Sequence, residues 1–395
     1  MYEYKKNGFF AQVTGKLESL CEEELVELGA TETRVVYKGV YFKTDIKTIY
    51  KINYTSRLLS RVLAPLITFP CKNTETLYRQ AKKMHWEDFC SIKNTFSITG
   101  SVANSRISNS LYASQCLKDA IADYFREKFG KRPNVEIVNP DVRFNLHIDK
   151  DICTISLDTS GESLHKRGYR LLAGEAPMQE TLAAAIIRLS KWDGQTTLLD
   201  PLCGSGTILS EALMHYCNIP AQRLRKKFGF FNLPEFDKQI WLKVKEECDG
   251  KIRPLVKNII AGSDKSQEAI RISKSNLSHL PYSENISLAC KPFQQLKEFE
   301  NGTLITNPPF GIRLGERDEV QILYKELGDF LKNKCSGTSA FIYTGSPELR
   351  KFIGLKTTKR LPLYNGKLEG VLLQIDSYKG SKKKKYQQQM SINQI

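Results

Sequence analysis

LLDPLCGSGT, residues 198–207, indicates the fold class of the second half of the chain. The apolar run TTLLD (196–200) predicts a short buried strand that ends on an acid, and two glycines then turn the chain into a helix. Strand and helix signals go on alternating as far as SAFIYTG (339–345), which is typical of a parallel sheet with helices on both faces. The last run, KRLPLYNGKLEGVLLQIDSY (359–378), predicts an antiparallel hairpin at one end of this sheet.

The turn after this first strand has the chemistry of a ligand site. Parallel sheets bind ligands at the carboxyl ends of their strands, and Gly204 and Gly206 allow the backbone close to a ligand. The third glycine of a dinucleotide loop is absent, and Asp200 would repel a pyrophosphate. A carboxylate suits instead a ligand with a cationic end, such as the ammonium of S-adenosylmethionine (SAM). A tight strand-to-helix connection with an acidic cap is the simpler alternative.

A second acid, Asp264, ends the next clear strand, IIAGSD (259–264). A carboxylate at this position can accept both ribose hydroxyls of a nucleoside. It can equally cap the helix predicted over 267–280. Together, Asp264 and Asp200 favour a nucleoside ligand more strongly than either acid alone.

The box Asn307-Pro308-Pro309-Phe310 follows the strand TLIT (303–306). Two prolines force an extended backbone and supply no N–H group, so their carbonyls can face a ligand as acceptors. The Asn307 side-chain oxygen and the Pro308 carbonyl then suit a planar exocyclic amino group, which has two donors. Phe310 offers a face on which a flipped-out base can stack. The alternative is a strand that simply ends at prolines.

The first 160 residues have a different pattern, which predicts two small α+β units. The first unit has a helix that Gly29 ends and a helix that Asp45 caps, and the second has a long helix that ends at Gly130. The predicted strands are 9–14, 34–44 (a hairpin around Gly39), 58–69, 96–102, 135–138, 144–149 and 153–161, and the predicted helices are 17–28, 45–53, 74–83 and 112–129.

The composition is that of a basic, folded protein with more than one domain. The chain has 395 residues with 59 Lys and Arg against 43 Asp and Glu, a formal net charge of +16, and it stays basic without its lysine-rich end. This favours a polyanionic partner, since Lys and Arg release counterions from phosphates. We expect a cytoplasmic protein, because no membrane span or signal peptide is evident. The ten cysteines contain no CxxC pair, so we expect small buried side chains and no metal.

LLDPLCGSGT, Asp264 and NPPF, in this order, resemble a Rossmann-fold SAM-dependent methyltransferase that acts on an exocyclic amino group. The whole chain, over about residues 5–378, resembles the bacterial 23S rRNA guanine-N2 methyltransferases that carry an N-terminal THUMP domain. This family is often labelled as adenine-specific DNA methylases, because both share the NPPF box. The matching segments are PDVRFNLHI (140–148), TISLDTSGESLHKRGYRLLAGEAPMQETLAAAI (154–186), LLDPLCGSGTILSEA (198–212) and TNPPFGIRLGE (306–316).

The resemblance implies an α/β Rossmann-fold domain that follows an α+β RNA-binding region. The expected boundaries are a ferredoxin-like segment over 1–55, THUMP over 56–160, the methyltransferase domain over 161–378 and a disordered lysine-rich tail over 379–395. The aromatic residues of 229–241 are expected to pack as a helical cap over the catalytic domain. No metal is expected, and we expect a monomer.

The resemblance also implies roles for individual residues. The target base would be held by Asn307, Pro308 and Phe310. Relatives usually place an acid near the adenine, and the stretch 289–293 (ACKPF) has none, so adenine is expected to stack on Phe293 or to use backbone groups. Residues 176–181 are expected to cover the cofactor. The expected SAM-binding residues are Asp200, Pro201, Cys203, Gly204, Gly206, Thr207, Asp264 and Phe293.

The implied partner is RNA, either 23S rRNA or an intermediate of large-subunit assembly. Six cations are candidate RNA contacts: Lys131, Arg132, Lys166, Arg167, Arg170 and Arg313. The alternatives within enzymes are a tRNA guanine-N2 or a DNA adenine-N6 methyltransferase. The alternative from another class is a non-catalytic RNA-binding protein of ribosome assembly. The intact motif residues disfavour this alternative.

Overall fold

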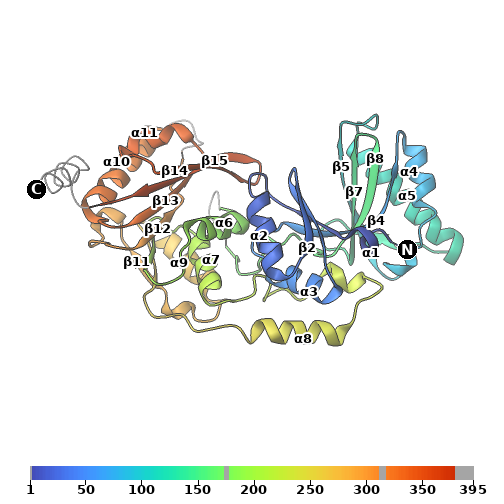
Figure 1. The fold of residues 1–395 in the computed structure, drawn as a ribbon, viewed down its shortest axis with the longest axis horizontal. Helices are drawn as coiled ribbons and strands as arrows, with labels where there is room; N and C mark the ends of the chain where they lie inside the picture. The colour runs from blue at the N-terminus through green and yellow to red at the C-terminus, as the bar shows by residue number, and fades with distance from the viewer. Residues whose placement is uncertain (1, 173–177, 311–316, 379–395) are drawn as a thin grey trace, which may run out of the picture. The chain divides into compact units, whose positions relative to one another are not determined.

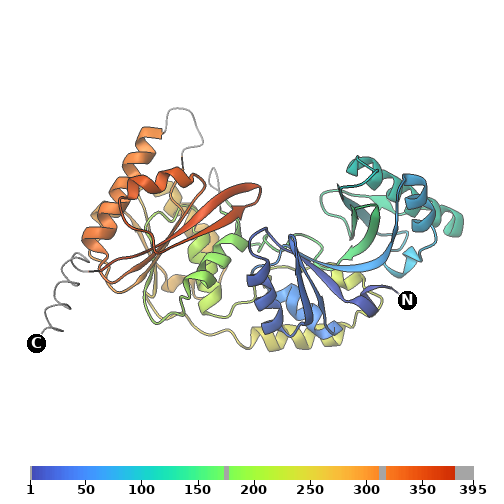
Figure 2. The same ribbon diagram turned by 45° about the horizontal axis from the view of Figure 1, so that its top comes forward.

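The chain folds into two compact units, and the computed structural model describes residues 2–172, 178–310 and 317–378 (Figures 1 and 2). The N-terminal unit consists of residues 1–167 and 220–250. The C-terminal unit consists of residues 168–219 and 251–395.

The N-terminal unit is built on one eight-stranded sheet in the order β2-β3-β1-β4-β8-β7-β5-β6. Strand β4 pairs with β1 through its first residues and with β8 along most of its length, so it joins the two predicted α+β units into a single sheet. Its elements are α1 (Tyr4–Asn7), β1 (Phe9–Gln12), α2 (Glu18–Leu28), β2 (Thr31–Val36), β3 (Gly39–Lys43), α3 (Ile46–Thr55), β4 (Arg61–Pro70), α4 (Thr74–Ala81), β5 (Thr95–Ala103), α5 (Ser110–Phe129), β6 (Asn134–Val135), β7 (Val142–Asp149), β8 (Ile152–Asp158) and α8 (Lys238–Asp249), with short 3₁₀ turns at Trp86–Asp88 and Gly229–Asn232.

Local signals predicted the ends of these elements well. Asp45 caps α3 by accepting a hydrogen bond of 2.7 Å from the Thr48 N–H, and Gly29 and Gly130 end α2 and α5 in the left-handed conformation. The hairpin of β2 and β3 is confirmed. The strand predicted over 135–138 is wrong in extent, because only Asn134–Val135 pairs with β5.

Residues 220–250 lie in the N-terminal unit, although the sequence on both sides belongs to the C-terminal one. Their aromatic rings pack on α3: Phe230 stacks on Tyr50 with ring centroids 4.6 Å apart, and Trp241 meets Tyr54 edge-on at 5.3 Å. The expectation of a cap over the catalytic domain is therefore wrong. The rings bury their area against a helix that lies about 180 residues earlier in the chain, a pairing that local sequence periodicity cannot reveal.

We expect Phe230→Ala to lower the free energy of unfolding of the N-terminal unit by about 3–5 kcal/mol, because its ring is fully buried among other aromatic rings. Phe231→Ala is the matched control, since this neighbour is only partly buried and should lose less. Urea denaturation followed by tryptophan fluorescence measures both. Equal losses in the two variants would show that 220–250 is not anchored through Phe230.

The C-terminal unit has a seven-stranded sheet in the order β11-β10-β9-β12-β13-β15-β14. The first five strands of this order are parallel, and β15 pairs antiparallel with both neighbours, which confirms the parallel sheet and its terminal hairpin. Its elements are α6 (Glu180–Ser190), β9 (Leu198–Asp200), α7 (Thr207–Tyr216), β10 (Ile260–Asp264), α9 (Gln267–Leu277), β11 (Ser287–Cys290), β12 (Thr303–Thr306), α10 (Arg317–Lys334), β13 (Ser339–Thr344), α11 (Arg350–Ile353), β14 (Lys359–Asn365) and β15 (Leu368–Asp376), with 3₁₀ turns at Ser283–Asn285, Phe293–Gln295 and Pro347–Leu349.

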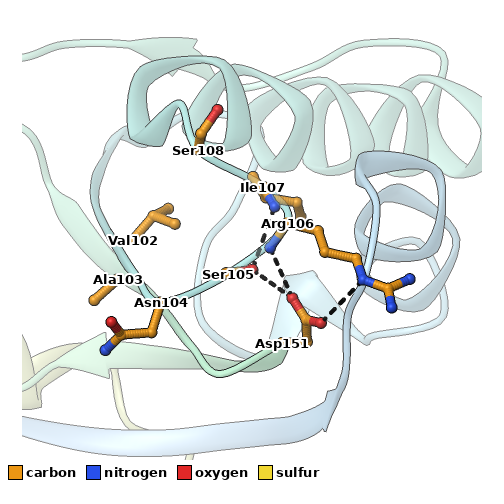
Figure 3. A pocket seen from close by; sticks show the side chains of 8 residues that line it. All are labelled: Val102, Ala103, Asn104, Ser105, Arg106, Ile107, Ser108 and Asp151. Carbon is orange, nitrogen blue, oxygen red and sulfur yellow. Dashed lines mark hydrogen bonds and ion pairs between the residues drawn. The ribbon is translucent and has the colours of Figure 1, made fainter.

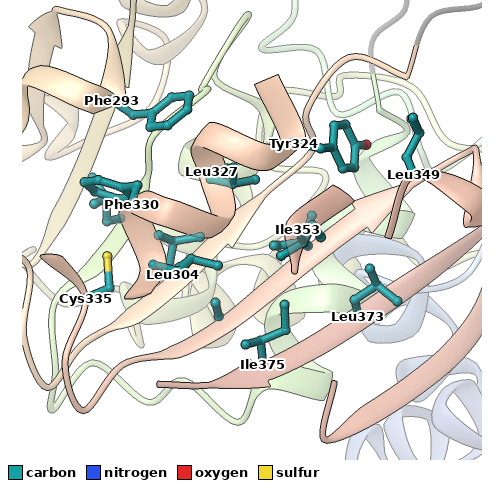
Figure 4. Close-up of a cluster of buried hydrophobic side chains, with 14 of the residues drawn as sticks. Phe293, Leu304, Tyr324, Leu327, Phe330, Cys335, Leu349, Ile353, Leu373 and Ile375 are labelled. Carbon is teal, nitrogen blue, oxygen red and sulfur yellow. The ribbon is translucent and has the colours of Figure 1, made fainter. Parts of the chain in front are cut away.

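Alternate residues of the central strands face opposite layers of helices. Leu304 of β12 and Ile342 of β13 pack with Leu327 of α10 in a buried cluster (Figure 4). Phe341, which lies between two residues of that cluster, lies beside Leu189 of α6 instead. Side chains of helices thus pack on both faces of the sheet at whose strand ends the candidate site lies.

Further features of the described residues concern their cysteines, potential metal ligands and helices. Eight of the ten cysteines are buried, as expected, while Cys116 is partly exposed and Cys290 is exposed. Within the described ranges, no cluster of three or more potential metal ligands occurs. No helix there is long and apolar enough to cross a membrane.

Candidate active site

The two acids and the NPPF box meet at one edge of the C-terminal sheet. Strand β9 lies between β10 and β12, and all three are parallel, so Asp200, Asp264 and Asn307 follow neighbouring strand ends. The Thr306 hydroxyl, just before Asn307, donates a hydrogen bond of 2.8 Å to Asp200. The Gly204 N–H donates one of 3.0 Å to Asp264. Hydrogen bonds thus link Asp200 to the residue before the NPPF box and Asp264 to the glycine turn.

Asp200 is a buried carboxyl group, with 1% of its surface exposed. Burial raises its pKa to about 7, and the nearby charge of Asp264 adds to the rise, while hydrogen bonds from Thr306 and from the Leu202 N–H oppose it. A buried carboxyl group of this kind gains from a cationic partner, because a positive charge nearby would stabilise its ionised form.

Asp200 should make stability depend on pH. Its pKa is raised on folding, so between about pH 4 and pH 7 the folded protein binds the proton more tightly and the free energy of unfolding falls as pH rises. Asp200→Asn keeps the shape and stays neutral. Without cofactor, we expect the melting temperature of the variant, relative to that of the wild type, to increase from about pH 5 to about pH 8. A difference that does not change with pH would contradict a buried carboxyl with a raised pKa.

The glycine turn is open on the side where a ligand would lie. Gly204 has φ +51°, and a Cβ built on it would meet no atom within 4 Å. Helix α9 holds the other side of the turn: Ser273 donates to the Gly204 carbonyl at 2.7 Å, and Asn276 donates to the Ser205 carbonyl at 3.0 Å. Ser273 and Asn276 were not predicted from the sequence, although buried polar residues on an otherwise amphipathic helix are a usable signal.

The rest of the turn is packed rather than reactive. Pro201 and Cys203 are buried, and burial raises the pKa of the Cys203 thiol, which keeps it protonated and a poor nucleophile. Thr207 starts α7 and accepts a hydrogen bond of 2.9 Å from Arg170. Arg170 also donates to the Met178 carbonyl and lies 3.2 Å from the Glu180 carboxylate. It therefore positions the start of α7 rather than facing RNA.

Phe293 does not offer a face for adenine. Its side chain is 1% exposed and packs edge-on against Phe330 of α10, with ring centroids 5.6 Å apart (Figure 4). The ring belongs to the hydrophobic core beneath the strand ends, so the structure gives no support to the expected stacking. Of the two adenine contacts expected from the sequence, the one with backbone groups near the end of β11 stays a prediction.

The NPPF box contains an unusual polar atom. The Asn307 Oδ1 atom is buried, and within the described residues it accepts no hydrogen bond. Buried acceptors normally have a partner, so an unpaired one at a strand end marks a place where a donor can be supplied by a ligand. Pro308 is buried and Pro309 is exposed. The half-buried Phe310 ring lies against Gly345, where a Cβ would come within 2.8 Å of it.

The candidate RNA-binding cations differ in their availability. Lys131 and Arg132 are exposed after α5, and Lys166 is exposed but paired with Glu162. Arg167 is only 1% exposed and donates to the carbonyls of Leu164 and Arg57, so the expectation that it contacts RNA is wrong. Arg313, and residues 176 and 177 of the expected cofactor cover, lie outside the described residues.

A surface depression of about 580 Å³ lies far from these motifs in the chain, at the end of β5 (Figure 3). Its one carboxylate among the lining residues, Asp151, already has partners. Asp151 accepts hydrogen bonds of 2.8 Å from Ser105 and 2.9 Å from the Arg106 N–H. We therefore assign the chemistry to the strand ends of the C-terminal unit.

A sheet of this order, with a glycine turn after its central strand and acids at the neighbouring strand ends, defines a Rossmann-like methyltransferase. Residues 167–374 match the family described as RMKL-like, methyltransferase domain. Residues 71–158 match the THUMP domain, and residues 8–63 match the RlmL ferredoxin-like domain. The chain belongs to the RMKL-like methyltransferase family and is a SAM-dependent enzyme with THUMP and ferredoxin-like domains.

Individual proteins show the same likeness along the whole chain. The Synechocystis protein named "Putative RNA methyltransferase slr0064" is 36% identical over 371 residues, which are 94% of this chain and 97% of that protein. The ribosomal RNA large subunit methyltransferase K/L of Syntrophotalea carbinolica is 36% identical over 93% of this chain and 53% of that protein. The chain therefore spans about half the length of the K/L relatives it matches. The crystal structure of SMU.472 with S-adenosylhomocysteine has a TM-score of 0.83 and 30% identity, over 94% of this chain and 98% of that one.

The residues present fit SAM. The open face of Gly204 leaves room for the ligand beside the turn, and the buried Asp200 favours its cationic end. Asp264 is partly buried at the neighbouring strand end, from which it could reach a ribose, and it already accepts a hydrogen bond from the Gly204 N–H of the turn. The unpaired Asn307 oxygen lies after the adjoining strand, where a substrate group can meet the cofactor.

Proposed function

We propose that this protein transfers a methyl group from SAM to the exocyclic N2 amino group of a guanine in 23S rRNA. The observation that carries this proposal is the buried Asn307 oxygen after β12, which has no hydrogen-bond partner among the residues that the structure describes. Guanine's amino group has two N–H donors in a plane, and Asn307 and the Pro308 carbonyl would accept one each. A ligand that supplies these donors would remove the desolvation penalty of the orphaned oxygen.

The chemistry would need orientation more than acid–base catalysis. The amino lone pair of guanine is delocalised into the ring, so the nitrogen is a poor nucleophile. Two acceptors that hold its N–H bonds would orient the lone pair of the nitrogen toward the methyl group. Such positioning lowers the barrier to transfer. SAM, when bound, supplies an electrophilic methyl group. No general base is assigned, because the proton can leave after transfer.

The target base would have to leave its helix to reach Asn307. Flipped bases are held by stacking on apolar or aromatic side chains as well as by hydrogen bonds. Phe310 would provide the stacking face, and its half-buried ring is held in place by the backbone of Gly345 and by core residues. The Ser346 hydroxyl lies 3.4 Å from the Phe310 carbonyl, which supports the same loop conformation.

The RNA substrate is supported by the domains that precede the catalytic unit. A THUMP match and relatives named ribosomal RNA large subunit methyltransferase K/L favour ribosomal RNA over DNA. Free 23S rRNA and an assembly intermediate of the large subunit both fit this proposal. Lys131 and Arg132, which are exposed, remain the candidate phosphate contacts outside the active site.

The substrate class is tested by methyl transfer from labelled SAM to 23S rRNA, bulk tRNA and duplex DNA, with each substrate offered to the full chain. We expect label in 23S rRNA well above that in the other two. Preferential labelling of tRNA or of DNA would replace the proposal with one of those enzyme classes. SAM binding without transfer to any of the three, or to large-subunit particles, would favour a non-catalytic RNA-binding protein.

A further inference from the structure

We propose that the open face of the ferredoxin-like sheet, formed by β2, β3 and β1, is a stacking surface for single-stranded RNA. Three planar side chains form a row across it. Arg34, Tyr41 and Phe10 are direct cross-strand partners, so all three point to the same face. This inference rests on the proposed function, because it takes RNA as the substrate.

The geometry of the row is that of a stacking platform. The Phe10 and Tyr41 ring centroids are 4.8 Å apart, and the Arg34 guanidinium lies 4.7 Å from the centre of the Tyr41 ring. Gly39 makes room for this arrangement, since a Cβ there would come within 2.1 Å of the Phe10 ring. Unpaired RNA bases stack on aromatic rings and on guanidinium planes, so a base can stack on the outer faces that this row leaves free.

The opposite face of the same strands shows what a covered surface looks like here. On this face Val35 of the edge strand β2 is 39% exposed, but on the inner strands β1 and β3 Phe9, Val40 and Phe42 are at most 4% exposed. By contrast, Tyr41 is 37% exposed and Arg34 is exposed. Exposed aromatic side chains on a sheet face without a covering layer mark an interaction site. A ligand with flat apolar surfaces fits such a site.

Charge on the hairpin favours a polyanion as that ligand. Within the described residues, Arg34 and Lys38 form no ion pair with a carboxylate, whereas Lys43 pairs with Glu32. Lys38 lies 5.2 Å from the ring of Tyr37 at the tip of the hairpin, where Tyr37 is 83% exposed. The hairpin thus presents two tyrosine–cation pairs, a combination that can bind both the bases and the phosphates of a single strand.

The test is fluorescence anisotropy of a labelled 12-nucleotide single-stranded RNA with the full chain. Tyr41→Leu should weaken binding about tenfold, because it removes the ring but keeps an apolar side chain of similar burial. Tyr41→Phe is the matched control and should bind within about twofold of wild type, since the ring stays. Arg34→Gln should weaken binding and lower the slope of log affinity against log salt by about one.

Equal affinities of Tyr41→Leu and Tyr41→Phe would overturn the inference, and so would equal binding of the same RNA as a duplex. A Tyr41→Leu variant that turns a dimer into a monomer in sedimentation would assign the surface to a second copy of the chain. Methylation of 23S rRNA by the wild type, measured in parallel, separates the two proposals. If it occurs while the Tyr41 variants bind alike, only this inference fails.

Discussion

Replacement of Asn307 by alanine is expected to reduce methyl transfer by about a hundredfold or more, while SAM binds as tightly as before. The variant removes the acceptor that would orient the target amino group, and it leaves the glycine turn and Asp264 untouched. Transfer is measured under single-turnover conditions with labelled SAM and 23S rRNA, and cofactor affinity by isothermal titration. Equal loss of transfer and of SAM binding would contradict the role of Asn307.

Stability gives this variant an internal control. Within the described residues the buried Asn307 oxygen has no partner, so its removal leaves no donor unpaired there and should not lower the melting temperature. A residue kept for structural reasons would behave in the opposite way. A clear fall in melting temperature together with lost activity would indicate that Asn307 supports the fold rather than the reaction.

Gly204→Ala is expected to weaken SAM binding by about tenfold or more, which corresponds to about 1.4 kcal/mol or more of lost binding free energy. Gly204 has φ +51°, and its missing side chain leaves the open space that we assign to the cofactor. A methyl group would occupy that space. Methyl transfer at low SAM concentration should fall in parallel and recover in part as the SAM concentration is raised.

Gly130→Ala provides a matched control for this substitution. Gly130 has φ +69°, and a Cβ there also meets nothing within 4 Å, but it lies at the end of α5 in the N-terminal unit. Both variants carry a similar backbone strain, of about 1 kcal/mol. Only Gly204→Ala should weaken SAM binding. Equal affinities in the two variants would contradict a cofactor beside Gly204.

Short-range signals explain why the sequence was informative about the strand ends. The residue types at Asp200, Asp264 and Asn307 follow apolar runs, and parallel strands bring such positions to one edge of a sheet. The capping residues Asp45 and Gly130 were predictable for the same reason, because each acts on its own helix end.

Long-range packing explains what was missed. Arg167 and Arg170 lie in a basic segment, yet one is buried on backbone carbonyls and the other fixes Thr207. Phe293 follows a strand end but faces the core, because Phe330 comes from a helix much later in the chain. The anchoring of 220–250 on α3 has the same origin. In each case the partner is distant in sequence, so residue type and spacing could not reveal it.

The most direct test of the central claim is the identity of the methylated nucleoside. 23S rRNA from a strain that lacks this enzyme would be methylated by the purified full chain, digested to nucleosides and analysed by mass spectrometry against standards. We expect N2-methylguanosine as the product, and none when Asn307→Ala replaces the wild type. A different methylated nucleoside from RNA, or N6-methyladenine formed in DNA, would contradict it.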